Sequence, residues 1–214
     1  MPLIEGLDQN TPEWICQRIG MVTASRMADV MSMLKKGGES QKRKDYKAEI
    51  VCETLTGRAS EHYVSPAMEH GIETEPLAAA AYEIKQGVEL EPGGFWAHDT
   101  ISRWGASPDR LVGDDGIVEI KCPTTATHLD YLLGGVVPEE YIPQITAQLA
   151  CTGRKWCDFV SYDDRLPAQY RLFIKRYERD EAKIKEAEDA VLTFLEEVTA
   201  ILQRLSHLGK EENP

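Results

Sequence analysis

Residues 107–123 read SPDRLVGDDGIVEIKCP. Apolar residues on both sides of the central GDDG predict two strands joined by a tight turn. Asp109 lies at the start of the first strand, and Glu119 and Lys121 lie on the second. Because side chains alternate across a strand, Glu119 and Lys121 face one side and Ile120 faces the other. The turn folds the strands back on each other, so we expect Asp109 to approach Glu119, and two carboxylates and one ammonium to share one site.

Such a site has the parts that phosphodiester hydrolysis needs. Two close carboxylates repel each other unless a cation lies between them, and oxygen ligands suit Mg²⁺ or Mn²⁺. The backbone carbonyl of Ile120 offers a third oxygen, and Lys121 is placed to orient or deprotonate a water and to stabilise charge on a phosphate. A plain alternative remains, since Glu-x-Lys on an exposed strand is often a surface ion pair and Pro-Asp commonly opens a turn.

The residues around this hairpin predict the fold class α/β (α+β), with a central mixed β-sheet flanked by helices. Short aromatic and β-branched segments predict further strands, at FWAHD (95–99), RWGAS (103–107), WCDFVSYD (156–163) and QYRLFIKRY (169–177). Apolar spacing and capping residues predict helices over 11–34, 41–57, 66–86, 124–133 and 141–152.

A long amphipathic helix is predicted at the end of the chain, over residues 180–208. Its apolar positions follow a three-and-four spacing and are Ile184, Ala187, Val191, Phe194, Leu195, Val198, Ile201, Leu202 and Leu205. Packing on the sheet accounts for such a stripe, and a contact between subunits is the alternative.

Length and composition indicate one globular domain, 1–214. The chain has 214 residues, of which 42% are hydrophobic and 28% are charged, which argues against disorder. No apolar run approaches the roughly 18 residues of a membrane span. The acidic start MPLIEGLDQNTPEW lacks the basic region of a secretory signal. We therefore expect a cytoplasmic protein that does not contact membranes.

The five cysteines are Cys16, Cys52, Cys122, Cys151 and Cys157. Their odd number and the lack of any C-x-x-C pair argue against a disulfide scaffold, a zinc site or an Fe–S cluster. We expect buried, unbridged thiols.

The charge balance opposes nucleic acid as a partner, but only weakly. The chain has 24 Lys and Arg against 36 Asp and Glu, a net charge of −12 with His neutral, whereas phosphate binding needs basic residues. Net charge says nothing about distribution, and one segment is locally basic. It contains Lys35, Lys36, Lys42, Arg43, Lys44 and Lys47, which form either part of a DNA path or a solvated loop.

Four blocks, in order across about residues 14–165, resemble the lambda-type phage exonucleases, the YqaJ-like viral recombinase family. They are WICQRIGMVTAS (14–25), GIETE (71–75), the stretch 107–123, and YIPQITAQLACTGRKWCDFVSYDDR (141–165). The third block has the Pro-Asp and Glu-x-Lys spacing of the PD-(D/E)xK nuclease superfamily. The resemblance therefore implies a restriction-endonuclease-like core.

The resemblance also implies roles. Asp109 and Glu119 match the metal-binding acids, with the Ile120 carbonyl as a third ligand. Lys121 matches the catalytic lysine. Glu75 matches an acid on a helix near the metal site, where it is available to a second metal ion. Gln144 matches a catalytic glutamine of the family. Gln148 lies one turn later on the same face and is placed on the DNA path, and which of the two glutamines enters the site stays open.

A 5′-phosphate pocket is implied for Arg18, Ser25 and Ser107, and an arginine fork with two hydroxyls suits a phosphate. Trp14 either flanks the DNA path or packs in the core. The family has a basic residue where this chain has Thr127. That DNA contact is therefore lost here, or moved to His128 or to the basic 35–47 segment.

The implied activity is a Mg²⁺-dependent 5′→3′ exonuclease that degrades one strand of linear double-stranded DNA with 5′-phosphate ends. The family implies a homotrimer that encircles DNA, and a 3′ single strand passed to a single-strand annealing protein during bacteriophage recombination. Two alternatives stay open. A PD-(D/E)xK endonuclease would use the same core, and a non-catalytic DNA-binding protein would have no metal-dependent turnover.

Overall fold

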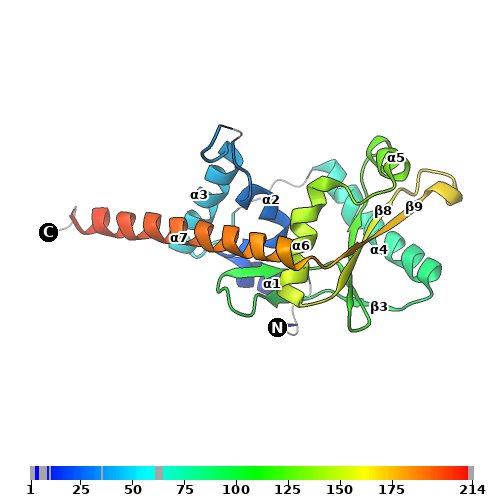
Figure 1. Cartoon of the computed structure of the whole chain (residues 1–214), viewed down its shortest axis with the longest axis horizontal. Coiled ribbons are helices and arrows are strands. Elements are labelled where there is room, and N and C mark those ends of the chain that lie inside the picture. Colours follow the sequence, from blue (N-terminus) through cyan, green and yellow to red (C-terminus); the bar gives the residue numbers. More distant parts are fainter. Residues whose placement is uncertain (1–2, 5–8, 10, 35, 61–64, 212–214) are drawn as a thin grey trace.

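The computed structural model describes residues 3–4, 9, 11–34, 36–60 and 65–211. Two β-sheets are surrounded by helices (Figure 1), which confirms the predicted mixed fold class. The helices are α1 Pro12–Arg18, α2 Met27–Val30, α3 Gln41–Thr56, α4 Pro66–Gln86, α5 Thr125–Gly134, α6 Ile142–Thr152 and α7 Glu181–Glu211, with 3-10 turns η1 Ala24–Arg26, η2 Glu139–Tyr141 and η3 Ala168–Tyr170.

The larger sheet contains the predicted hairpin. Its strand order is β3-β6-β7-β8-β9, with β3 Leu90–Pro92, β6 Arg110–Val112, β7 Gly116–Lys121, β8 Trp156–Tyr162 and β9 Leu172–Glu178. Neighbours are antiparallel except β7 and β8, which are parallel. Parallel neighbours need a long crossover, and α5 and α6 provide it. The carboxyl ends of β7 and β8 therefore lie at the same edge of the sheet.

Helices cover both faces of this sheet, so β7 is buried along most of its length. On one face, Val118 and Ile120 pack with Tyr82 of α4. On the other, Ile117 and Phe159 belong to the core that α6 and α7 share. This arrangement confirms the predicted alternation of side chains along β7.

The smaller sheet has the order β1-β4-β5-β2, with β1 Leu3–Ile4, β4 Phe95–Ala97, β5 Trp104–Ala106 and β2 Val22–Thr23. The helix predicted through 11–34 is therefore wrong at β2. Val22 and Thr23 pair in parallel with Trp104 and Gly105, and Val22 is fully buried. Its β-branched side chain fits a buried strand, so tertiary packing overrides the helical spacing.

This parallel pairing brings two serines together. Since β2 and β5 run in the same direction, the residues that follow both strands lie at the same edge of the sheet. Ser25 follows β2 and Ser107 follows β5. Two hydroxyl residues far apart in the sequence are thus brought to one place.

The predicted C-terminal helix corresponds to α7, which runs past α3 to one end of the molecule (Figure 1). Its buried side chains are Ile184, Ala187, Val191, Phe194 and Val198. They pack chiefly against α6, α3 and α2, so helix–helix packing largely replaces the predicted packing on the sheet.

The five cysteines are free, but only Cys151 and Cys157 are buried. Cys16 and Cys52 are exposed and Cys122 is half-buried, so burial of all five was wrongly predicted. In the described part of the chain, every helix is too short or too polar to cross a bilayer.

Candidate active site

The hairpin brings Asp109, Glu119 and Lys121 close to one another, as predicted. Asp109 Oδ2 accepts a hydrogen bond from the Ile120 N–H over 2.6 Å, which fixes this carboxylate beside β7. Lys121 Nζ donates to Glu119 Oε1 over 2.5 Å. Gly93 lets the backbone pass close to Pro108, just before Asp109, because a Cβ at position 93 would lie 1.6 Å from the Pro108 carbonyl oxygen.

Both glutamines that the sequence left as alternatives contact Glu119. Gln144 Nε2 donates to Glu119 Oε1 and Gln148 Nε2 donates to Oε2, each over 2.5 Å. They lie one turn apart on α6, so they project from the same face. Glu119 is only 1% exposed, and a buried carboxylate needs such donors.

A cavity of about 700 Å³ opens beside the hairpin, and its walls include Glu75, Asp109, Ile120, Lys121, Tyr141 and Arg165. Glu75, on α4, forms an ion pair with Arg110 over 2.9 Å. Arg110 also donates to the Asp109 carbonyl oxygen over 2.6 Å. The helix acid named by the resemblance thus lines the same cavity as Asp109, whereas the sequence did not predict Arg110.

Burial and charge set the protonation of these groups. Burial raises the pKa of Asp109 well above its ordinary value, and the nearby Glu119 raises it further. Burial alone would lower the pKa of Lys121, but the carboxylates of Glu119 and Asp109 raise it overall. Lys121 is therefore an ammonium at neutral pH, suited to stabilise negative charge rather than to accept a proton.

The donor set suits a hard divalent cation. Two carboxylates and one ammonium leave unbalanced acidic charge, and the Ile120 carbonyl adds an oxygen that Mg²⁺ prefers. Among the residues that the structure describes, no three His, Cys, Asp or Glu side chains come close enough together to hold a metal ion. Asp109 and Glu119 could hold a metal ion only together with other oxygens, such as the Ile120 carbonyl, and Glu75 lines the same cavity as Asp109.

A separate cavity of about 570 Å³ is lined by Trp14, Arg18, Thr23 and Ser25, among others. The Arg18 guanidinium lies 3.8 Å from the centroid of the Trp14 ring, and Trp14 Nε1 donates to Ser107 Oγ over 3.0 Å. Burial lowers the pKa of Arg18 to about 10, so it remains charged at neutral pH. Trp14 is half-buried and connects Arg18 to Ser107.

The basic 35–47 segment is divided by the fold. Arg43 and Lys47 are buried and form ion pairs with Glu39 and with Glu197 of α7, at 2.6 Å for Arg43 and Glu197. The prediction that Arg43 lies on a DNA path is therefore wrong, because its side chain holds α3 to α7. The side chains of Lys36, Lys42 and Lys44 are exposed, and their contact with DNA stays a prediction. Lys35 lies outside the described residues.

His128 does not replace the family's basic residue at Thr127. Its side chain is fully buried, with Nδ1 2.7 Å from Ser161 Oγ and Nε2 2.8 Å from the Tyr170 carbonyl oxygen. Since Nε2 must donate to that carbonyl, Nδ1 accepts from the serine hydroxyl. His128 therefore holds α5 to β8, so of the alternatives given for the contact missing at Thr127, the one that moves it to His128 does not fit the structure.

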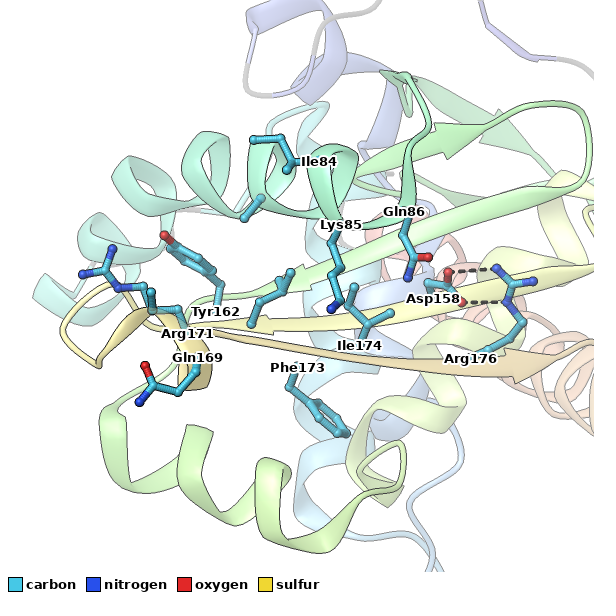
Figure 2. A pocket seen from close by; sticks show the side chains of 13 residues that line it. Ile84, Lys85, Gln86, Asp158, Tyr162, Gln169, Arg171, Phe173, Ile174 and Arg176 are labelled. Atoms are coloured by element: carbon cyan, nitrogen blue, oxygen red, sulfur yellow. Dashed lines mark hydrogen bonds and ion pairs between the residues drawn. The ribbon is translucent and has the colours of Figure 1, made fainter.

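A further cavity, of about 1140 Å³, lies between the C-terminal half of α4 and the strands β8 and β9 (Figure 2). None of its described lining residues is a predicted catalytic residue. Figure 2 shows Arg176 of β9 with both oxygens of Asp158, at 2.8 and 2.9 Å. Although this cavity is larger than the one beside the hairpin, cavity size does not identify the candidate active site. The acidic and basic side chains around the hairpin identify it.

Asp163, which follows β8, makes protein stability depend on pH. Burial alone would raise the pKa of Asp163, but hydrogen bonds from the side chain and the backbone N–H of Arg165 help to lower it to about 2, from an ordinary 3.8. Its carboxylate therefore stabilises the fold above about pH 4, and this stabilisation is lost as pH falls toward 2. We expect Asp163→Asn to lower the free energy of unfolding by about 2 kcal/mol at neutral pH and by about half as much at pH 3. Urea unfolding of both proteins across this range checks it, and a difference that stays constant with pH contradicts it.

Comparisons with known proteins place the chain in a family. The sequence profile of the YqaJ-like viral recombinase domain matches residues 13–155. The crystal structure of an alkaline exonuclease (LHK-Exo) from Laribacter hongkongensis is similar, with 46% identity, a TM-score of 0.87 and coverage of 94% of this chain and 99% of that chain. The structure of LHK-Exo in complex with dAMP gives the same values.

A phage related exonuclease from Haemophilus somnus 129PT shares the fold, at 15% identity and a TM-score of 0.66, covering 86% of this chain and 96% of its own. No curated protein matches the chain. The fold and the acidic hairpin define the PD-(D/E)xK class of nuclease cores. Within that class, the chain belongs to the YqaJ-like viral recombinase family.

Proposed function

We propose that this protein is a Mg²⁺-dependent exonuclease that degrades one strand of linear double-stranded DNA from 5′ to 3′. One observation carries the proposal. Ser107 is hydrogen-bonded to Trp14, on which Arg18 stacks, and Asp109, two residues later, begins the acidic site. A pocket suited to a terminal phosphate thus adjoins a hydrolytic site. The similarity to an alkaline exonuclease crystallised with dAMP supports this proposal.

Each residue of the acidic site has a proposed task. Asp109, Glu119 and the Ile120 carbonyl hold Mg²⁺, or Mn²⁺ in its place, and Glu75 is available to a second ion. When bound, the ion polarises the scissile phosphodiester and activates water. Lys121 places positive charge beside the phosphate and orients the water. Gln144 and Gln148 keep the Glu119 carboxylate in one orientation by donating to both of its oxygens.

The end of the DNA is held separately. Arg18, Ser25 and Ser107 bind the 5′-phosphate, where an arginine and hydroxyl donors suit the charge and geometry of the ligand. This contact selects phosphorylated ends and sets the distance from the end to the scissile bond. Closed circular DNA has no such end and is not a substrate.

The wider proposal follows the family. The chain acts as a single nuclease domain, 1–214, in a homotrimeric ring around duplex DNA. Its 3′ single-stranded product passes to a single-strand annealing protein in phage-type recombination, in the cytoplasm of a bacterial host.

The test uses three DNAs, namely linear duplex with 5′-phosphate ends, the same duplex with 5′-hydroxyl ends, and a closed circle. Each is incubated with Mg²⁺ or EDTA and with wild-type or Lys121→Ala protein. We expect Mg²⁺-dependent loss of the linear forms only, faster with 5′-phosphate and absent in the variant. Cutting of the circle would indicate an endonuclease instead. No cutting by wild-type protein with Mg²⁺ or Mn²⁺ would leave a non-catalytic DNA-binding protein.

A further inference from the structure

Arg165 ends the fourth sequence block, and none of the roles above uses it. Its side chain lines the catalytic cavity together with Glu75, Asp109 and Lys121. It is 46% exposed, so part of the guanidinium is open to a ligand.

Two hydrogen bonds to the protein hold this guanidinium in one orientation. Arg165 Nε donates to Asp163 Oδ1 over 2.6 Å, and Nη2 donates to the Pro123 carbonyl oxygen over 2.8 Å. Asp163 follows β8 and Pro123 lies shortly after β7, so the side chain bridges the carboxyl ends of the two parallel strands. Within the described residues, these bonds use two of the five N–H donors of the arginine and leave three.

The acidic partner of Arg165 lies in the protein interior, whereas the arginine itself is partly exposed. The Asp163 carboxylate is fully buried, so it balances the arginine from the protein interior, and Asp164 is also close enough to favour the charged form. Among the described residues, two other basic side chains near this cavity already pair with acids, since Lys121 pairs with Glu119 and Arg110 pairs with Glu75. Arg165 is therefore the cation of this cavity best placed for a phosphate that enters from solvent.

A second arginine provides a matched comparison. Arg176 is also 46% exposed and pairs with a buried aspartate, Asp158, which is 3% exposed. It differs in three respects. Two of its N–H groups bind one carboxylate, its guanidinium lies 3.6 Å from the centroid of the Trp156 ring, and it lines a different cavity (Figure 2). Burial and pairing are thus shared, whereas a position on the catalytic cavity belongs to Arg165.

We propose that Arg165 binds a backbone phosphate of the DNA strand that occupies the catalytic cavity, and that Asp163 positions it. The proposal rests on DNA being the substrate. This phosphate is distinct from the 5′-terminal one at Arg18. The fixed fork donates to two non-bridging oxygens and loses little side-chain entropy, because its orientation is set before the DNA arrives.

The test measures DNA affinity apart from turnover. Arg165→Gln and Arg176→Gln are each made in Lys121→Ala protein, and anisotropy of a labelled 5′-phosphorylated duplex is recorded in Ca²⁺ over a range of KCl. Arg165→Gln is expected to weaken binding about tenfold or more and to reduce the slope of log K against log[salt] by about one. Arg176→Gln is expected to change neither. Thermal unfolding of each variant checks that it is folded.

Two further arms separate direct contact from a structural effect. Neutral methylphosphonate linkages are placed one at a time along the strand that is cut. One of them is expected to weaken binding by the protein with Arg165 and to have no added effect with Arg165→Gln. Asp163→Asn keeps the arginine charge but replaces the charged acceptor of its Nε–H by a neutral one and so holds the side chain less firmly, which is expected to weaken binding less and to leave the salt slope unchanged.

The outcomes distinguish this inference from the proposed function. If Arg165→Gln matches Arg176→Gln in salt slope and at every linkage, Arg165 does not bind the strand, even where the wild-type protein degrades linear DNA. If the slope and linkage effects appear while the wild-type protein degrades no DNA, the contact stands and the exonuclease proposal fails.

Discussion

Substituting Asn for Asp109 is expected to slow Mg²⁺-dependent degradation of linear DNA by roughly 10³-fold or more. The amide keeps the size of the carboxylate and can still accept the hydrogen bond from Ile120 N–H. It removes the negative charge that holds the metal ion. Initial rates over a range of Mg²⁺ concentrations measure the effect.

The same substitution is expected to raise stability without metal. The pKa of Asp109 is raised by burial and by Glu119, so its ionised form destabilises the folded state at neutral pH. Removing the charge relieves this repulsion, and denaturant unfolding in EDTA is expected to show a higher free energy of unfolding. Asp114→Asn is the control, since Asp114 is exposed in the turn of the same hairpin. Activity of Asp109→Asn within tenfold of wild type would show that Asp109 does not hold the metal.

Replacing Arg18 by Ala is expected to reduce kcat/KM on 5′-phosphorylated ends by about 10- to 100-fold. A hydrogen bond between charged groups contributes about 1.5–3 kcal/mol, which corresponds to this range. On 5′-hydroxyl ends the same variant is expected to match the wild type, because the phosphate that Arg18 binds is missing. Initial rates at low substrate concentration are measured for the wild type and Arg18→Ala on 5′-phosphate and on 5′-hydroxyl ends. The four kcat/KM values form a cycle that gives the interaction free energy between the Arg18 side chain and the phosphate.

A control arginine lies far along the chain on α7, where Arg204 is exposed. Arg204→Ala is expected to leave both ends unaffected. An equal loss by Arg18→Ala on both kinds of end would mean that Arg18 supports the fold or the duplex, and not the terminal phosphate.

The parts of the fold that the sequence predicted are those with local causes. The hairpin of β6 and β7 follows from a turn sequence between alternating segments, and α7 follows from a long regular spacing. The strand β2 has two residues and exists through pairing with Trp104 and Gly105, which no local pattern encodes. Arg43 appeared to be part of a basic surface because its partner Glu197 lies 154 residues later.

The same distinction holds in the active site. Asp109, Glu119 and Lys121 lie within 13 residues of one hairpin, and both their types and their spacing carry the prediction. The contacts of Gln144 and Gln148 with Glu119 depend on how α6 packs, so the sequence left two alternatives. Arg165 ends the fourth sequence block, but no local pattern predicts a role for it. Its place on the cavity depends on the parallel pairing of β7 and β8.

The link between Ser107 and Asp109 determines the step size of the proposed enzyme. Two residues span at most about 7 Å, and the one between them, Pro108, is buried, with its carbonyl oxygen accepting a hydrogen bond from Gln9 over 2.8 Å. Covalent geometry would therefore keep the proposed 5′-phosphate site and the proposed point of cleavage at a fixed separation. If the proposed function holds, each cut would remove the nucleotide that is held, the strand would advance in equal increments, and every increment would require release and renewed capture of a 5′-phosphate.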